Sequence, residues 1–560
     1  MQIALGAVGG GSRTIAAPSS LAGLRNYSLQ NRKQQQQQQR LLQRKEERNE
    51  RQQGIGRSSW RKRRRGFLTM TESMSEGVRQ MTVSPSGKQW VEKGGLQAIP
   101  RLDDYLGPLP RISNPMINNK FFKPAEGFFV TDYDVCSQFV AFDTRHLGTP
   151  VYFLRAGPRE SVVFKPHEVK AAIVTCGGLC PGINTVIREL VMGLSDLYDV
   201  QSIDGIKAGY RGFYSGDKMK LNRHVVDDWH RKGGSVLGTS RGGFDLEKIV
   251  DGIEEAGYNQ LYVIGGDGTM RGASMISEEI TKRNLKITMT AIPKTVDNDI
   301  GIIDKSFGLD TAVEKAQAAI SAGHVEAQST PNGVGVVKLM GRNAGHIALR
   351  ATLSSRDVDC CLIPEVPFFT EGPGGLFEFL DGRISENGHC VVVVAEGAGQ
   401  DLIPRTAEQG FDDSGNLQLL DIGQWLVAEL KKWWKKHNPD KLFAVKYIDP
   451  TYMVRAVPSN AADTFFCTLL AQSAVHGAMA GYTSFVAGTV NGVYCYIPLD
   501  QISQSTHKVD IHNHIWAWVR SINSQPDFKA CENRNSNGSA SDMDLNFTPK
   551  EKAAAAEKSD

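Results

Sequence analysis

The middle of the chain alternates between short apolar runs rich in β-branched residues and amphipathic stretches of helical spacing. The apolar runs cover residues 171–175, 260–264, 287–292, 335–339 and 390–395, and the amphipathic stretches include 185–194 and 311–322. Short runs of this kind are typical of buried parallel strands. The pattern therefore predicts an α/β fold with doubly wound sheets, in which ligands bind beyond the carboxyl ends of the strands.

The two ends of the chain lack this pattern. Residues 1–70 contain a glutamine run at 34–39 and a basic cluster at 61–65, a composition that cannot form a packed core and predicts disorder. Residues 71–167 mix proline, glycine and aromatic residues without a clear period, and we expect them to be an N-terminal approach segment packed on the catalytic body. Residues 526–560 are polar and are expected to form a flexible tail.

Charge is distributed unevenly along the chain. The first 66 residues hold 15 Lys or Arg and only three acidic residues, whereas the remainder holds 49 basic and 58 acidic residues. The mildly acidic remainder argues against nucleic acid as a partner. An arginine-rich start with no acidic residue before Glu46 is typical of a transit peptide, here for the chloroplast rather than the mitochondrion. A disordered cytoplasmic tail and a nuclear signal stay open as alternatives.

Other bulk properties exclude further classes of protein. With 560 residues and 41% hydrophobic content the chain can bury more than one core. No apolar run approaches the ~18 residues of a membrane-spanning helix, so no membrane partner is expected. The nine cysteines are an odd number without metal-ligand spacing, which favours reduced thiols. Cys176 and Cys180 would suit a redox or zinc pair, but no second pair accompanies them.

Two glycine turns follow predicted strands. After 171–175 the sequence reads Cys-Gly-Gly-Leu-Cys-Pro-Gly-Ile-Asn, and after 260–264 it reads Gly-Gly-Asp-Gly-Thr. Glycines let backbone N–H groups approach a phosphate, and a helix start adds partial positive charge. In the second turn Asp267 can reach Mg²⁺ directly or through water while the amides hold a polyphosphate. A ligand-free turn with a structural acid is the alternative.

A third candidate element, 293–299, follows the strand 287–292 and reads Pro-Lys-Thr-Val-Asp-Asn-Asp. One of its carboxylates can accept the proton of an attacking sugar hydroxyl and the other can hold a metal, while Lys294 and Thr295 can contact phosphoryl oxygens. These are the parts that a phosphoryl-transfer site needs. A solvated Asp-Asn-Asp turn would use the same residues.

Two further loops begin at predicted strand ends. Arg342 follows the run 335–339 and can bind a phosphoryl group through two parallel hydrogen bonds, whereas Glu396 follows 390–395 and suits sugar hydroxyls. A structural ion pair would explain either residue alone. Their shared position at strand ends indicates a site.

Eight strings within residues 168–500 together resemble the phosphofructokinase family. In chain order they are GGLCPGIN (177–184), GTSRGG (238–243), GGDGT (265–269), PKTVDND (293–299), MGRNAGHIA (340–348), IPE (363–365), AEG (395–397) and YMVR (452–455). Eight ordered matches do not arise by chance. The resemblance implies two Rossmann-like doubly wound domains with the active site in the cleft between them. Residues 168–305 with about 455–525 would bind the nucleotide, and residues 306–454 the sugar phosphate.

The resemblance also implies an activity, the transfer of the γ-phosphoryl group of ATP to the 1-hydroxyl of fructose 6-phosphate with Mg²⁺, which is the committed step of glycolysis. Allosteric control and a homo-oligomer, commonly a tetramer, are implied as well. Asp297 is similar to the family's general base, and an ordinary carboxylate with a pKa of ~4 can assist late in a loose transition state. Asp267 is similar to the acid linked to Mg²⁺.

The remaining site residues are carried over at matching positions. Those that surround the base are Thr295, Asp299, Lys294 and Arg342. Those that match ATP-contacting positions are Gly178, Arg241, Gly242, Gly266, Asp267, Gly268, Thr269 and Gly272. Those that match the sugar-phosphate pocket are Thr295, Val296, Asp297, Met340, Gly341, Arg342, Glu396, Tyr452 and Arg455, of which the last two help to hold the 6-phosphate.

Two positions bear on the phosphoryl donor. Gly268 resembles the ATP-using branch, because pyrophosphate users typically carry a second Asp there, whereas Lys294 is typical of the pyrophosphate users. Their combination resembles the ATP-dependent enzymes of plants, so ATP is the expected donor and pyrophosphate the alternative. The chain departs from bacterial members at 332–333, where Asn-Gly replaces an arginine that reaches the neighbouring subunit's site.

Two other functions compete with these. A non-catalytic regulatory subunit would have no physical need for Asp267, Asp297 and Arg342 together. A Rossmann dehydrogenase would need a Gly-x-Gly-x-x-Gly turn with a ribose-binding acid about 20 residues on, which the sequence lacks.

Overall fold

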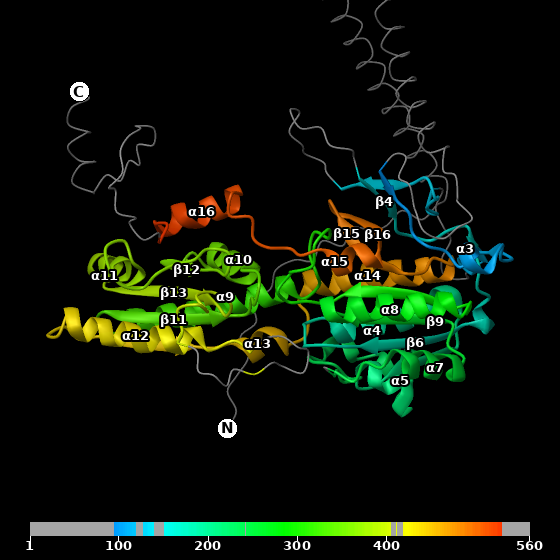
Figure 1. Ribbon diagram of the computed structural model, residues 1–560, viewed down its shortest axis with the longest axis horizontal. Coiled ribbons are helices and arrows are strands. Elements are labelled where there is room, and N and C mark those ends of the chain that lie inside the picture. Colours follow the sequence, from blue (N-terminus) through cyan, green and yellow to red (C-terminus); the bar gives the residue numbers. More distant parts are fainter. Residues whose placement is uncertain are drawn as a thin grey trace, which may run out of the picture. The chain divides into compact units, whose positions relative to one another are not determined.

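The computed structural model describes residues 95–118, 127–138, 151–240, 242–404, 410 and 418–528. They form a mixed α/β fold with two sheets built mainly of parallel strands and one two-stranded sheet (Figure 1). The predicted transit peptide and almost all of the predicted tail lie outside the described residues. None of the described helices combines the length and apolar character of a membrane span.

The larger sheet has ten strands in the order β1-β4-β16-β15-β10-β9-β6-β7-β8, with β3 paired to β4 off this path. The strands of its parallel centre are β15 (Phe485–Val490), β10 (Thr288–Pro293), β9 (Gln260–Gly265), β6 (Lys170–Thr175) and β7 (Ser202–Ile206). The chain leaves β6 towards β7 on one side and returns to β9 on the other side. This reversal is the point at which doubly wound sheets bind ligands.

Helices cover both faces of the ten-stranded sheet because successive side chains of a strand point to opposite faces. In β6, Ala171 and Ile173 pack in one cluster with α4 (Ile183–Met192) and α14 (Ala461–Met479). Ala172 and Val174 pack in another cluster with α7 (Leu246–Ala256) and α8 (Asp267–Lys282). The short helices α5 (Gly212–Ser215), α6 (Arg223–Val226) and α15 (Leu499–Gln504) and the antiparallel strands β8 (Lys218–Lys220) and β16 (Val493–Pro498) complete this part.

The second sheet has four parallel strands in the order β12-β13-β11-β14. Its strands are β12 (Cys360–Leu362), β13 (His389–Ala395), β11 (Gly333–Leu339) and β14 (Ala444–Ile448). Side chains of one face pack with α9 (Leu309–Gln328) and α10 (His346–Ser355), and those of the other face with α11 (Leu376–Asn387) and α12 (Ile422–His437). The loops after β11 and β13 are neighbours because these two strands pair along their whole length.

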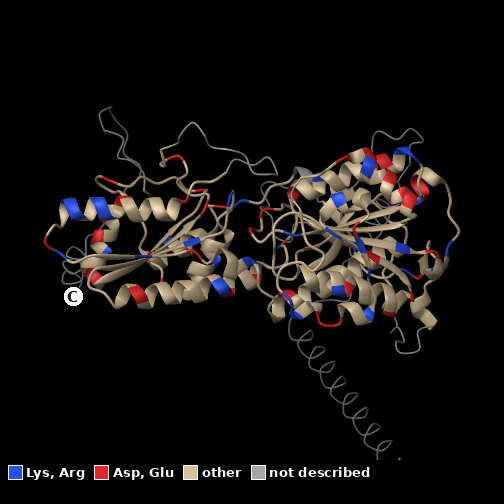
Figure 2. Ribbon diagram, turned by 90° about the horizontal axis from the view of Figure 1, so that it is seen from below, with Lys and Arg blue, Asp and Glu red and all other residues tan. Residues whose placement is uncertain are grey.

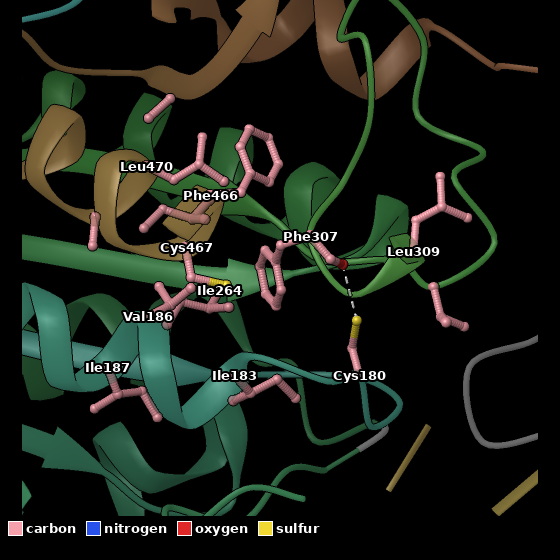
Figure 3. Packing of buried hydrophobic residues seen from close by; sticks show 14 of the residues in the cluster. Cys180, Ile183, Val186, Ile187, Ile264, Phe307, Leu309, Phe466, Cys467 and Leu470 are labelled. Atoms are coloured by element: carbon pink, nitrogen blue, oxygen red, sulfur yellow. Dashed lines mark hydrogen bonds between the residues drawn. The ribbon is translucent and has the colours of Figure 1, made fainter. Parts of the chain in front are cut away.

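One hydrophobic cluster is shared by the two larger sheets. It contains residues of α4 and α14 together with residues of α9 and α10. Figure 3 shows Phe307 from the loop before α9 among Ile183, Cys467 and Leu470, and the Cys180 thiol donates a hydrogen bond to the carbonyl of Phe307 at 3.1 Å. The strand ends of both sheets are therefore connected through packed side chains.

The N-terminal part described here packs on the edge of the ten-stranded sheet. Its elements are β1 (Leu96–Gln97), α3 (Asp103–Leu106), β2 (Ile112–Ser113), β3 (Val135–Ser137), β4 (Tyr152–Arg155) and β5 (Ser161–Val162). The Asp132 carboxylate accepts hydrogen bonds from Arg101 at 2.5 Å, Arg159 at 3.2 Å and the Tyr482 hydroxyl at 2.5 Å. This network lines a cavity of about 180 Å³ and fixes the segment before β6 to the turn before β15.

The predicted strands and helices are confirmed to within a few residues at most of their ends, although α9 runs on to Gln328. The range 455–525, which the sequence assigned to the nucleotide-binding part, contacts both of the larger sheets in the structure. Helix α16 (His514–Asn523) packs against α10, and Gln525 exchanges hydrogen bonds with the backbone of Cys361 in β12. The last residues of the range 455–525 thus contact the four-stranded sheet, while the domain boundaries themselves stay a prediction.

A buried carboxylate on α14 caps the start of α9, and its removal tests how strongly this junction stabilises the fold. Asp463 accepts hydrogen bonds from Gly308 N at 2.9 Å, Thr311 N at 2.7 Å and Thr311 Oγ1 at 2.6 Å. Asp463→Ala leaves three buried donors without an acceptor and should lower the free energy of unfolding by ~3 kcal/mol. The thermal unfolding midpoint measures this. Asp245→Ala, which removes the exposed cap of α7, is the matched control and should change the midpoint much less.

Candidate active site

Three of the predicted motifs meet where β6, β9 and β10 end. The Lys294 ammonium, which follows β10 and is buried, donates a hydrogen bond to the carbonyl of Gly178 at 2.5 Å. A β-carbon on Gly177 would lie 3.6 Å from Lys294 Nζ and 4.0 Å from Thr269 Oγ1. The two glycine turns and the lysine therefore line the same crevice, at the reversal point of the sheet.

Both glycine turns lead directly into helices. Gly182 has φ +100° at the start of α4, a conformation that side chains other than glycine rarely adopt, and Gly266 precedes α8 in an extended conformation. Each helix begins with backbone N–H groups that have no partner inside the helix. A β-carbon on Gly268, in the first turn of α8, would meet no protein atom within 4 Å. The start of α8 is thus open to an anionic ligand.

An aromatic pair borders this crevice at Gly272 and was missed by the sequence analysis. A β-carbon on Gly272 would lie 2.9 Å from the Phe244 ring and 3.1 Å from the Tyr210 ring, and these two rings make an edge contact with centroids 5.5 Å apart. The Tyr210 hydroxyl also donates a hydrogen bond to the Thr269 carbonyl at 2.8 Å. The signal that could have indicated this pair is the position of Tyr210 shortly after β7, a strand that the sequence analysis did not predict. Gly242 lies nearby in sequence and is exposed with φ +78°, and Arg241 is outside the described residues.

The loop after β10 folds around its own side chains. The Thr295 hydroxyl donates a hydrogen bond to Asp299 at 2.8 Å and accepts one from Asp297 N at 3.3 Å. Asn298 has φ +58°, and its side chain accepts a hydrogen bond from Ser306 N at 2.8 Å. Val296 is buried in the shared core. Internal bonds therefore hold the Asp299 carboxylate and the backbone of Asp297, but not the Asp297 carboxylate.

Asp297 is the most unusual titratable group of the site. Arg342 N lies 3.5 Å from Oδ2, whereas Oδ1 is buried with no hydrogen-bond partner among the described residues. Burial raises the pKa of Asp297 from 3.8 to about 7, and the negative charges of Glu396 and Asp299 act in the same direction against the opposing Arg342. The ordinary pKa of ~4 expected for this carboxylate is therefore not what the structure gives.

The loops after β11 and β13 contact each other as their positions predict. Glu396 N donates to the Leu339 carbonyl at 2.9 Å and Gly397 N donates to the Gly341 carbonyl at 3.1 Å. A β-carbon on Gly397 would lie 1.8 Å from the carbonyl oxygen of Arg342, so only glycine permits this approach. Burial also raises the pKa of Glu396, while the charge of Arg342 lowers it. Met340 is partly buried against the shared core.

Arg455 and Tyr452 lie on α13 (Thr451–Arg455) and join the site to different degrees. The charge of Arg455 is close enough to lower the pKa of Glu396, and its Nε is buried without a hydrogen-bond partner among the described residues. Tyr452 is 74% exposed, and its ring contacts the Arg455 guanidinium at 5.3 Å. Arg455 therefore belongs to the cluster, whereas Tyr452 reaches it only through Arg455.

Asp267 and Asp299 are the two carboxylates that could hold a divalent cation. Asp299 raises the pKa of Asp267, although burial is the larger cause and Arg271, with Nη2 at 2.7 Å from Oδ2, opposes both. In the described part of the chain no three His, Cys, Asp or Glu side chains are gathered into a metal cluster. Two neighbouring carboxylates fit a Mg²⁺ ion that takes its other ligands from water and from bound phosphate.

The two thiols of the first glycine turn are not joined to each other. Cys176 and Cys180 are free and buried, and burial raises the pKa of the Cys176 thiol to about 12. All the cysteines that the structure describes are free and buried. Asn332, noted for its departure from bacterial members, has φ +51° and bonds the Leu442 carbonyl at 2.8 Å before β11 begins. It lies at the opposite end of β11 from Arg342.

Figure 2 shows acidic and basic residues interspersed on the helices of both sheets. In the crevice, charged groups of both signs lie close together. Lys294, Arg342 and Arg455 lie among Asp267, Asp297 and Glu396, so cationic groups that suit phosphates stand beside acids that suit a hydroxyl or a metal.

Comparison with known proteins extends over most of the chain. The sequence matches the phosphofructokinase family over residues 170–478. It is 62% identical over 419 residues to ATP-dependent 6-phosphofructokinase 2 of Arabidopsis thaliana, covering 74% of this chain and 94% of that protein. It is 53% identical over 436 residues to ATP-dependent 6-phosphofructokinase 4, chloroplastic, of the same organism, covering 77% and 82% of the two chains.

Solved structures agree at the level of the fold. The crystal structure of pyrophosphate-dependent phosphofructokinase from Marinobacter aquaeolei aligns with a TM-score of 0.51 at 19% identity, covering 61% of this chain and 86% of that chain. The family match, the identity to the Arabidopsis proteins and the shared fold lead to one conclusion: this chain belongs to the phosphofructokinase family.

Proposed function

We propose that this protein transfers the γ-phosphoryl group of ATP to the 1-hydroxyl of D-fructose 6-phosphate, giving fructose 1,6-bisphosphate and ADP. The observation that carries the proposal is the state of the Asp297 carboxylate. Its Oδ1 is buried with no hydrogen-bond partner among the described residues, and burial raises its pKa to about 7. A base is most effective when its pKa lies near the working pH.

The nucleotide would lie across the two glycine turns. The starts of α4 and α8 supply N–H groups for its phosphates, and the Tyr210–Phe244 pair beside Gly272 offers aromatic surface to its base. Lys294 supplies a fixed positive charge beside Gly178. Phosphoryl transfer depends chiefly on such positioning and charge neutralisation.

The sugar phosphate would face the loops after β11 and β13. Asp297 accepts the proton of the 1-hydroxyl as that oxygen attacks the γ-phosphorus, and the proton stays on Asp297 until it is lost to solvent. Arg342 neutralises phosphoryl oxygens, Glu396 accepts hydrogen bonds from sugar hydroxyls, and Arg455 with Tyr452 holds the 6-phosphate. When bound, Mg²⁺ would neutralise charge on the β- and γ-phosphates. Asp267 and Asp299 are the residues that would hold it.

ATP is favoured over pyrophosphate as donor by the open space at Gly268. A β-carbon there would meet nothing within 4 Å beyond its own helix backbone among the described residues, so glycine leaves this position open to a ligand. The relatives of 62% and 53% identity are named as ATP-dependent. Pyrophosphate stays the alternative donor because a lysine at position 294 is typical of the pyrophosphate users.

Assembly and location follow the family resemblance and the composition. We propose a homo-oligomer, a tetramer by resemblance. One of the relatives compared is named chloroplastic and the other is not, so chloroplast and cytoplasm both agree with them. The arginine-rich, acid-poor start supports the chloroplast.

The first test removes the base. Asp297→Asn should lower kcat with ATP and fructose 6-phosphate by ~10² to 10⁴, because an amide cannot take the proton. In the wild-type protein kcat/KM should fall as the pH drops below about 7, since the raised pKa leaves Asp297 protonated there. A coupled assay comparing ATP with pyrophosphate at equal Mg²⁺ gives both results.

The stability of the same variant is its control. Because the folded protein holds the Asp297 proton more tightly than the unfolded chain does, wild-type stability falls as the pH rises from ~4 towards 7. Asp297→Asn lacks this loss and should unfold at a higher temperature than wild type at pH 8, with the advantage shrinking towards pH 5. A stable variant with wild-type kcat would refute Asp297 as the base.

The donor is tested at Gly268. Gly268→Asp should raise KM for ATP at least ~10-fold, because a second carboxylate at the start of α8 repels the nucleotide phosphates, while the thermal midpoint should stay unchanged. Gly268→Ala is the matched control, since it adds bulk without charge and should have a smaller effect. An unaltered KM for ATP in Gly268→Asp would contradict the nucleotide's placement.

The location is tested with residues 1–70 fused to a fluorescent protein in leaf cells. We expect fluorescence in chloroplasts, and a control fusion in which the basic residues at 61–65 are replaced by glutamine separates plastid import from nuclear import. Diffuse cytoplasmic fluorescence of the first fusion would contradict a transit peptide.

A further inference from the structure

The chain between α15 and α16 crosses the loops of the candidate active site. Residues 505–509, here called the strap, begin where α15 ends on the ten-stranded sheet, and the chain continues to α16 on the four-stranded sheet (Figure 1). Thr506 forms an isolated antiparallel bridge with Ile300. Ile300 directly follows residues 294–299, the loop after β10 that carries Asp297, here called the base loop. A β-carbon on Gly301 would lie 2.7 Å from the Ser505 side chain, so the two segments are in close contact.

His507 bonds two successive carbonyl groups of the base loop, those of Asn298 and Asp299. Its Nδ1 lies 3.0 Å from the carbonyl oxygen of Asn298, and its backbone N donates to the Asp299 carbonyl at 2.8 Å. Because a carbonyl only accepts hydrogen bonds, this shorter contact requires the tautomer with the proton on Nδ1; the same nitrogen lies 3.4 Å from Asn298 Nδ2. Asn298 has φ +58° and separates the two carboxylates of the loop. Conformations of this kind persist only where surrounding contacts enforce them.

The strap also contacts His346 at the start of α10 and reaches the loop that carries Arg342 through Glu365. The His507 carbonyl oxygen lies 3.4 Å from His346 Nε2, and the two imidazole rings pack with centroids 4.4 Å apart. Two residues on, Val509 N donates to the Glu365 carboxylate at 2.7 Å. That carboxylate accepts Gly345 N through both oxygens, at 3.1 and 3.2 Å, where the Arg342 loop becomes α10.

We propose that the strap holds the base loop and the Arg342 loop in register, with His507 as the positioning residue that keeps Asp297 opposite Arg342. The inference rests on the proposed function. His507 makes no part of the crevice described above, and it acts through Asn298 and Asp299. The distance that depends on it is the 3.5 Å between Arg342 N and Asp297 Oδ2, which joins the two loops.

The strap predicts a specific pattern among variants of His507 in the full-length protein. His507→Ala removes the donor to Asn298 and should lower kcat ~10- to 100-fold while each substrate's KM changes less than threefold, because a small misplacement of reacting groups costs rate more than binding. His507→Asn places an amide donor where imidazole Nδ1 stood and should retain kcat within a few-fold. His512→Ala, an exposed histidine of the same connection, is the matched control and should behave as wild type.

Amide hydrogen exchange reads the strap without relying on turnover. In His507→Ala the segments 294–306 and 340–346 should exchange faster together, whereas the core strand β13 should keep its wild-type protection. If wild type shows no kinase activity, the proposed function fails, and the exchange pattern still tests the strap.

Two results would overturn the proposal. One is that His507→Ala has the same amide hydrogen exchange and the same kcat as the wild-type protein. The other is an equal loss of kcat in His507→Ala and His507→Asn, which would show that the Nδ1 hydrogen bond does not position the base.

Discussion

The arrangement of the site depends on one constraint, the burial of a carboxylate that must remain able to ionise near neutral pH. Asp297 has an oxygen with no hydrogen-bond partner in the described part of the chain and stands near two other acids, so its charged form is disfavoured. The neighbouring groups hold this balance, since Arg342 opposes the rise in pKa and Glu396 with Asp299 adds to it. Under the proposed function, the site combines a cost in stability with a reactive base, as catalytic sites often do.

The fold meets this constraint by bringing strand ends from two sheets to one place. Lys294 and Asp297 follow β10 in the larger sheet, whereas Arg342 follows β11 in the smaller one. Neither sheet alone contains both the glycine turns and the sugar-side loops. The junction is held by the shared core around Phe307 and by Asp463, whose buried carboxylate caps α9 from α14. Packing far from the chemistry thus keeps the two halves opposite each other.

Much of this arrangement could be predicted from the sequence because its signals are local. Apolar runs followed by glycine turns gave the strands, the α/β class and the crevice at their carboxyl ends, since strand, turn and helix are encoded within about 20 residues. The raised pKa of Asp297 could not be predicted in this way. It arises from burial and from Glu396, which lies 99 positions away in the chain and is near only in the folded protein.

The role of the strap could not be predicted from the sequence for a related reason. His507 stands in a polar stretch without periodicity or glycine signal, and its meaning comes from a contact with Asn298, 209 residues earlier. In the proposal, that contact adds to the hydrogen bond from Ser306 N in holding Asn298, the left-handed residue between the two carboxylates. A connection that looks like a linker in sequence can therefore act as part of the catalytic framework, since a loop that carries a buried base is not rigid by itself. Part of the rigidity has to come from another segment, and the strap contacts the base loop directly and reaches the Arg342 loop through Glu365.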